Sequence, residues 1–253
     1  MGSLIVVVPF ASALILGVLT YDLYRRHQQY HGAHRHLLFW AIGLGMFGIA
    51  SLCDGILELT WSEPAFLGWY LFGAILNAAW IGQGTVFLLV RKRWVFATAM
   101  VLALLSIVTA IMLLSTPLNA QAYQAGVPIA DQYQNILQRD ALVRRLTPFF
   151  NIYGTITLVG GALYSGYLFY RKKILPNRVM GNVLIAAGAL AIAGAGVLNR
   201  FGLGQFHSFA QLIFAVLMYF GFVLASKPAA VQENERVQPI RPMPLKQKKS
   251  RSG

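Results

Sequence analysis

Long apolar runs, separated by short polar or basic stretches, dominate the pattern of this chain. Crossing the hydrocarbon core of a bilayer takes about 20 consecutive, mostly apolar residues. A backbone exposed to lipid must satisfy its own hydrogen bonds, so each such run is expected to be a helix. The pattern therefore predicts an all-α integral membrane protein whose seven transmembrane helices occupy residues 1–226. The expected spans are Ser3–Tyr24, Leu37–Leu59, Ala65–Val90, Trp94–Ser115, Pro148–Tyr170, Val179–Arg200 and Phe206–Ser226.

Basic residues orient these spans, because cytoplasmic loops carry an excess of Lys and Arg. All but four of the 21 basic residues lie in the loops after the first, third and fifth spans or in the C-terminal tail. The pattern predicts an N-terminus outside, a cytoplasmic C-terminus and a multi-pass protein of the cell membrane. The net charge of +13 then mostly reports this topology, so no nucleic-acid partner is expected. The four exceptions are Arg139, Arg144, Arg145 and Arg200.

Composition agrees with a membrane protein and narrows its class. Hydrophobic residues make up 57% of the chain and charged residues only 11%, whereas soluble domains contain about 25% charged residues. The single cysteine, Cys53, excludes a disulfide-stapled secreted domain. No predicted span contains a lysine, which excludes a retinal Schiff base. The lipid bilayer is the one partner that composition requires.

Two regions lie outside the predicted spans. Residues 116–147 form a long external loop, in which Ala130–Leu146 has apolar residues at helical spacing. This segment predicts an amphipathic helix on the membrane surface or over the bundle, and a poorly ordered loop is the alternative. Residues 227–253 form a basic tail with four prolines, which is expected to be disordered and cytoplasmic.

The first and fifth spans share a rough pattern that allows an internal repeat, although aromatic and basic helix ends are common at any cytoplasmic interface. Pro9-Phe10 and Pro148-Phe149 lie near their beginnings, and an aromatic-rich stretch followed by basic residues ends each of them. The first and fifth spans also start on the same side of the membrane. A parallel duplication of three spans, with the fourth span as connector, is therefore allowed.

Polar groups inside the spans indicate where a binding site is expected, because an ionisable group in the membrane costs several kcal/mol unless it is paired or hydrated. Asp54 and Glu58 share one face of the second helix. We hypothesise a polar ligand pocket in the outer half of the bundle, in which these two carboxyl groups face Arg200 and His207. The alternative is a structural salt bridge between Arg200 and either carboxyl group. The candidate residues are Asp54, Glu58, Asn77, Trp80, Asn151, Asn199, Arg200, His207 and Gln211.

Other features have simpler interpretations. The sixth span is rich in Gly and Ala, which allow close helix contact and predict a central position or a homodimer face. His27, His31, His34 and His36 lie in one short region without a carboxylate or cysteine. They therefore favour a positively biased turn over a metal site. No catalytic residue, metal or cofactor is predicted.

These observations leave several functions open. The first is non-enzymatic binding or sensing of a small molecule or lipid through the outer pocket. The second is an accessory subunit that packs against a membrane protein partner. A small transporter with three-plus-one-plus-three spans is the third, although proline is absent from the middle of the spans. An enzyme is not expected, because no convincing nucleophile accompanies Asp54, Glu58 and His207.

Overall fold

The computed structural model describes residues 2–31, 33–90, 92–172, 175–201 and 203–226. Within these ranges, seven helical segments are long and apolar enough to cross a membrane, which confirms the predicted all-α class with seven spans. The predicted tail, 227–253, lies outside the described residues. The first three spans are α1 (Gly2–Gln29), α2 (Arg35–Leu59) and the continuous segment α3 (Glu63–Gly68), η1 (Trp69–Leu76) and α4 (Asn77–Leu89).

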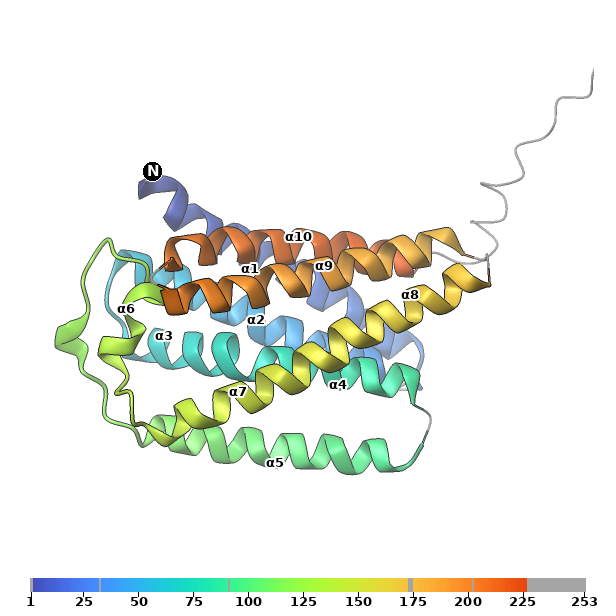
Figure 1. Cartoon of the computed structure of the whole chain (residues 1–253), viewed down its shortest axis with the longest axis horizontal. Helices are drawn as coiled ribbons and strands as arrows, with labels where there is room; N and C mark the ends of the chain where they lie inside the picture. Colours follow the sequence, from blue (N-terminus) through green and yellow to red (C-terminus); the bar gives the residue numbers. More distant parts are fainter. Residues whose placement is uncertain (1, 32, 91, 173–174, 202, 227–253) are drawn as a thin grey trace, which may run out of the picture.

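The fourth span is α5 (Trp94–Leu114), which leads into the short helices η2 (Ala120–Ala122) and α6 (Ile129–Ile136). The fifth span joins α7 (Leu142–Thr155), η3 (Ile156–Gly160) and α8 (Gly161–Arg171) without a break. The chain then forms α9 (Pro176–Leu198), the 3-10 turns η4 (Asn199–Phe201) and η5 (Gly204–Phe206), and α10 (His207–Ala225). Figure 1 shows all spans running along the long axis of the molecule.

The predicted amphipathic segment is divided between two helices. Its first part is α6, and its last part belongs to the fifth span, which begins at Leu142 instead of the predicted Pro148. The helix starts earlier because Val143 is fully buried and Arg144 donates a hydrogen bond to the carbonyl oxygen of Leu137 at 3.1 Å. Pro148 therefore lies inside α7 and does not mark its beginning.

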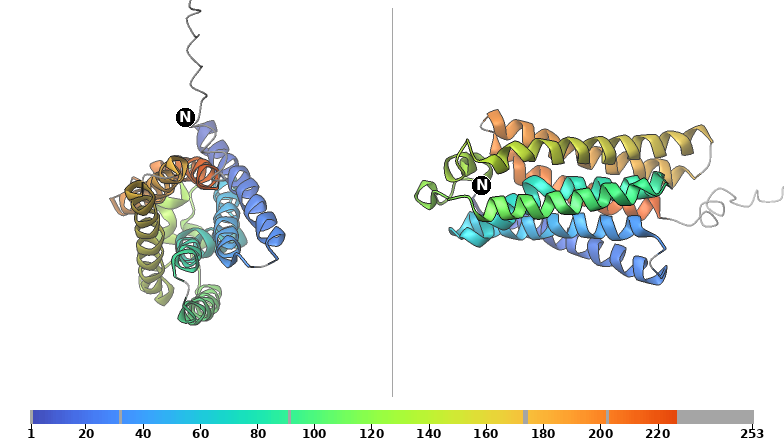
Figure 2. Two further views of the ribbon diagram at one scale, coloured as in Figure 1. Left: turned by 90° about the vertical axis from the view of Figure 1, so that its right-hand side faces the viewer. Right: turned by 90° about the horizontal axis from the view of Figure 1, so that it is seen from below.

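Six spans form a closed ring, and the fourth lies outside it. Around the ring, α1 packs on α2, α2 on α4, α4 on α7 and η3, α8 on α9, α9 on α10, and α10 on α1. Viewed along the bundle, the ring surrounds a central space and α5 stands apart, beside α4 and α7 (Figure 2).

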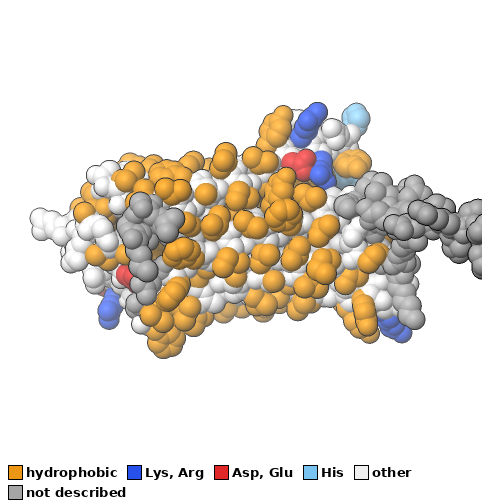
Figure 3. All heavy atoms as spheres, turned by 90° about the horizontal axis from the view of Figure 1, so that it is seen from above, with side chains coloured by type: hydrophobic (Ala, Val, Ile, Leu, Met, Phe, Trp, Pro, Cys, Tyr) orange, Lys and Arg blue, Asp and Glu red, His pale blue; other side chains and the backbone are white. Residues whose placement is uncertain are grey.

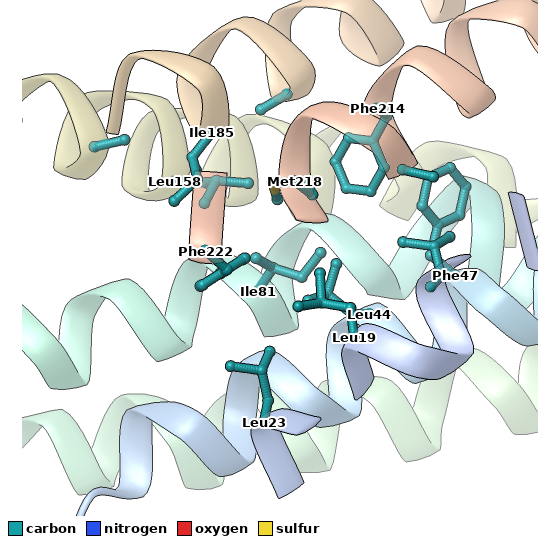
Figure 4. Packing of buried hydrophobic residues seen from close by; sticks show 14 of the residues in the cluster. Leu19, Leu23, Leu44, Phe47, Ile81, Leu158, Ile185, Phe214, Met218 and Phe222 are labelled. Atoms are coloured by element: carbon teal, nitrogen blue, oxygen red, sulfur yellow. The ribbon is translucent and has the colours of Figure 1, made fainter. Parts of the chain in front are cut away.

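Hydrophobic side chains close the ring near one end. We call the end with the α1–α2, α4–α5 and α8–α9 connections the basic end, and the opposite end the α6 end. Leu23, Leu44, Ile81, Met218 and Phe222 point toward one another between the helices (Figure 4). On the face that Figure 3 shows, hydrophobic side chains lie along the middle of the molecule, and charged side chains lie near the two ends. This distribution suits a molecule with lipid around its middle.

Candidate functional site

A cavity of about 660 Å³ occupies the centre of the ring in its α6-end half. Its walls come from α2, η1, α4, α7, η3, α9 and α10, and α6 contributes Tyr133. Most of the wall is apolar, with Phe47, Ile81 and Phe214 among the larger contributors. The core cluster described above lies between this cavity and the basic end.

Five of the nine predicted site residues lie in the cavity wall, although they come from three separate spans and from the turn η4. They supply amide and imidazole groups to a surface where no described lining residue is Asp, Glu, Lys or Arg. The structure thus brings together the neutral part of the predicted set. These residues are Asn77, Asn151, Asn199, His207 and Gln211.

Hydrogen bonds hold several of these side chains in place. The amide of Asn199 lies 3.3 Å from Nδ1 of His207, across the connection between α9 and α10. Gln211 donates from Nε2 to Oγ of Ser51, which itself donates to the carbonyl oxygen of Phe47 at 2.8 Å. The side-chain oxygen Oδ1 of Asn199 is buried and has no partner among the described residues. A buried acceptor without a partner is costly, so Asn199 leaves one hydrogen-bond acceptor free at the wall.

Two π-helical segments occur in the described part of the chain, and both border the cavity. Segment η1 places Trp69, Tyr70 and Ala74 in the wall, and η3 contributes Ile156 and Leu158. A π-helical turn leaves local carbonyl groups out of the regular α-helical ladder, and such turns are frequent at functional sites. Sequence reasoning missed this feature, since the hydropathy pattern of a π turn is the same as that of an α-helix.

Aromatic side chains supply a part of the site that the sequence did not indicate. Tyr70 and Trp69 belong to the cavity wall and are buried. The hydroxyl of Tyr70 lies 3.5 Å from Oγ1 of Thr147. Trp69 also lies edge-on to His207, with ring centroids 6.4 Å apart. Trp69 lies near the end of its span, where tryptophan is also common at the membrane interface. The sequence therefore did not distinguish an interfacial position from one in a cavity wall.

Asp54 lies outside the cavity wall, in contrast to its predicted role. It is only 1% exposed and lies beside the Ser208 side chain, while its Oδ2 has no partner among the described residues. Asp54 follows Ala50 of the wall by one helical turn. It nevertheless lies beyond the cavity toward the α6 end, where the first turn of α10 covers it.

Glu58 also lies outside the wall, and its carboxyl group lies beside the backbone N–H of Ile129, the first residue of α6. Its Oε1 is buried and has no hydrogen-bond partner among the described residues. A carboxylate at a helix N-terminus interacts favourably with the helix dipole. Burial and the neighbouring Glu58 raise the pKa of Tyr123, whose hydroxyl donates to the carbonyl oxygen of Leu57 at 2.8 Å.

The remaining two predicted residues have different outcomes. Trp80 turns away from the cavity, stacks on Phe39 at 5.5 Å between centroids and donates to Oγ of Ser106 at 3.1 Å. The side chain of Arg200 lies outside the described part of the chain. The structure therefore does not test whether Arg200 faces the two carboxyl groups or forms the alternative salt bridge.

Helix α6 covers the α6 end of the cavity. Tyr133 packs against Trp69 and Tyr70, with ring centroids 5.9 Å and 6.1 Å apart. On its other side, Oδ1 of Asp131 accepts a hydrogen bond from the backbone N–H of Gly204 at 2.6 Å. Helix α6 therefore contacts both the third span and the α9–α10 connection, and Glu58 of the second span lies beside its first residue. The predicted alternative of a helix capping the bundle describes this arrangement.

No protein family, curated protein or solved structure matches the chain. The chemical content of the cavity therefore carries the functional argument. The wall offers neutral hydrogen-bond donors and acceptors, aromatic rings and aliphatic surface. Such a wall can bind a molecule and orient it by a few hydrogen bonds.

Proposed function

We propose that this chain is a binding protein of the cell membrane that holds one uncharged, amphipathic small molecule in its central cavity without converting it. The observation that carries the proposal is the convergence of five amide and imidazole side chains, with the hydroxyl groups of Tyr70, Tyr133, Thr147 and Thr155, on a cavity whose remaining wall is mostly apolar. Its volume of about 660 Å³ lies within the range of small-molecule sites, about 300–1,000 Å³.

The ligand's polar group is expected near Asn199 and His207. The free Oδ1 of Asn199 can accept a hydrogen bond from a hydroxyl or amide group of the ligand. A charged head group is disfavoured, because burying a charge without an opposite partner is costly and the described wall supplies no formal charge of either sign. The apolar part of the ligand would contact the aliphatic part of the wall, which includes Ile152, Ile156 and Val197.

Native mass spectrometry of protein gently extracted from membranes tests this proposal. We expect a discrete adduct of one mass on the wild type, and an occupancy at least tenfold lower on Asn199→Leu. Asn135→Leu is the matched control, because Asn135 is exposed on α6 and does not line the cavity. Equal adducts on all three proteins, or none on the wild type, would contradict the proposal.

Transport is the second candidate, and the ring of six spans is the observation that favours it. Two three-span halves meet around the cavity, which is the arrangement in which repeats rock against each other in many transporters. Transport requires the core at the basic end to open as well as α6. Counterflow of the bound compound in liposomes separates the two functions, because a binder that does not transport gives no counterflow.

We also propose that the basic end faces the cytoplasm. The connections at that end contain Arg35, Arg93, Arg171 and Lys172, and positive charge in short loops sets orientation. A single cysteine placed at Gln28 in a Cys53→Ser protein tests this. It should react with a membrane-impermeant maleimide only after the cells are permeabilised, whereas a cysteine at exposed Gln121 should react in intact cells.

A further inference from the structure

The cavity wall has an opening on the side of the molecule, between α7 and α9. Three apolar residues line the cavity and are also more than half exposed on the outer surface: Ile152 (58%), Ile156 (66%) and Val197 (55%). Figure 1 faces this side, where α9 lies against α8 and separates from α7 toward the α6 end. A residue that both lines a cavity and is exposed marks a place where the cavity reaches the surface.

The rim of this opening contains very small residues on the α9 side. Ala193 and Gly196 lie in the wall, and a Cβ atom built on Gly196 meets no atom within 4 Å. The absence of side chains along this edge leaves room between the two helices. The opposite edge is formed by the flexible aliphatic side chains Ile152 and Ile156.

We expect the opening to face lipid and not water. Its rim residues belong to the fifth and sixth spans, Leu142–Arg171 and Pro176–Leu198, and the rim residues named above are all apolar. The two water-facing ends are covered by Tyr133 of α6 and by the core cluster near the basic end. The described structure therefore offers a route from the bilayer into the cavity.

We propose that the cavity receives its ligand from the bilayer through the α7–α9 opening, and that the ligand is a membrane-dissolved amphiphile with one apolar chain and an uncharged hydroxyl or amide head group. The inference rests on the proposed binding function and specifies its ligand class. The head group lies at Asn151, Asn199 and His207, and the chain extends past Ile152, Ile156 and Val197 toward the lipid.

Cysteine labelling tests the route without knowledge of the ligand. In Cys53→Ser protein, Ala74→Cys places one thiol on the η1 wall, away from α9. In liposomes, N-pyrenylmaleimide, which dissolves in the bilayer, should label this thiol at least tenfold faster than a charged, membrane-impermeant maleimide present on both sides. Gly196→Phe fills the opening and should slow labelling by the pyrenyl reagent at least tenfold.

Gly194→Phe is the matched control, because a Cβ atom at Gly194 also meets nothing within 4 Å but this residue does not line the cavity. When Gly194→Phe is added to the Ala74→Cys protein, the rate of labelling by the pyrenyl reagent should stay unchanged. Val197→Trp provides a second way to fill the opening if Gly196→Phe does not fold. Faster labelling by the charged reagent, an unchanged pyrenyl rate in both filled variants, or no labelling by either reagent would overturn the lateral route.

The outcomes for route and function remain distinguishable. Labelling reports access to the wall and does not depend on whether a ligand is held there. A monoacylglycerol with a photoreactive chain then tests the ligand class. It should crosslink to α7 or α9 in the wild type and at least tenfold less in Asn199→Leu, and crosslinking that is equal in both proteins would overturn the assigned head-group contact.

Discussion

Nδ2 of Asn151 donates a hydrogen bond to the carbonyl oxygen of Ala74 at 2.9 Å. The bond joins the fifth span to the π-helical turn of the third span, and both residues line the cavity. A carbonyl group of η1 thus finds its partner on another helix. The same contact that holds two walls together also fixes the orientation of a polar group inside the site.

Asn151→Leu should weaken both the fold and the site. Interhelical hydrogen bonds in membranes contribute about 0.6 kcal/mol on average and at most about 1.7 kcal/mol, so we expect a loss of about 1 kcal/mol in unfolding free energy. Unfolding in SDS, followed by circular dichroism, measures this loss. Phe149→Leu on the exposed face of the same helix is the control, and an equal loss in both variants would contradict the assigned contact.

Gly154→Ala should destabilise the contact between α4 and α7. A Cβ atom at Gly154 would overlap the backbone of Ala78 and Ala79, and overpacking typically costs about 1–3 kcal/mol. Gly160→Ala is the matched control, because Gly160 lies in the same span with nothing within 4 Å of a built Cβ atom. We expect a lower thermal midpoint for the first variant alone, and equal midpoints would show that the backbones can separate freely.

Gln83 connects three spans. It accepts a hydrogen bond from the Tyr153 hydroxyl and donates to the carbonyl oxygen of Val95 at 3.2 Å and to Oγ1 of Thr98 at 3.1 Å. Gln83→Leu should lower the unfolding free energy by about 1–2 kcal/mol, because several of these interhelical bonds are lost together. Tyr153→Phe should cost less. A double-mutant cycle in SDS measures their coupling, and additive losses would refute a direct bond.

Tyr133→Ala should open the α6 end of the cavity. The phenol ring covers Trp69 and Tyr70, and its removal exposes the wall to water while Asp131 still holds α6. The charged maleimide should then label Ala74→Cys at least tenfold faster than in the parent. Tyr30→Ala, at an exposed position near the basic end, should leave the rate unchanged. An unchanged rate in Tyr133→Ala would mean that other residues cover the end.

The seven spans followed from the sequence because each hydrophobic run is long enough to require burial in lipid. The position of the cavity could not be predicted from the sequence, because it depends on how the helices are rotated against one another. Trp80 illustrates the difference. Trp80 lies three positions after Asn77, which is about 300° of helix rotation. The two side chains therefore differ in direction by about 60°. That angle suffices to turn Trp80 toward α5 while Asn77 faces the cavity.

The acidic pair shows a second reason. Asp54 and Glu58 were predicted as site residues because membrane carboxyl groups are rare and functional by default. In the structure, Asp54 lies beside Ser208, and Glu58 lies beside the N-terminus of α6. A structural use of a carboxyl group needs a partner from a distant segment, and that pairing leaves no periodic signal. The neutral amides lie in the wall because they come from helix faces that the ring turns inward.

The fourth span, α5, determines the relative direction in which the spans before it and the spans after it cross the membrane. Three crossings leave the chain on the side of the membrane opposite to its start, so two such units joined directly would run in opposite directions. One additional crossing returns the chain and makes the units parallel. Because α5 performs this return outside the ring, much of its surface contacts lipid, with Met100, Leu104 and Ile111 exposed. Its outward face should therefore accept almost any apolar residue, whereas each ring helix also has an inward face that packs on the core or lines the cavity.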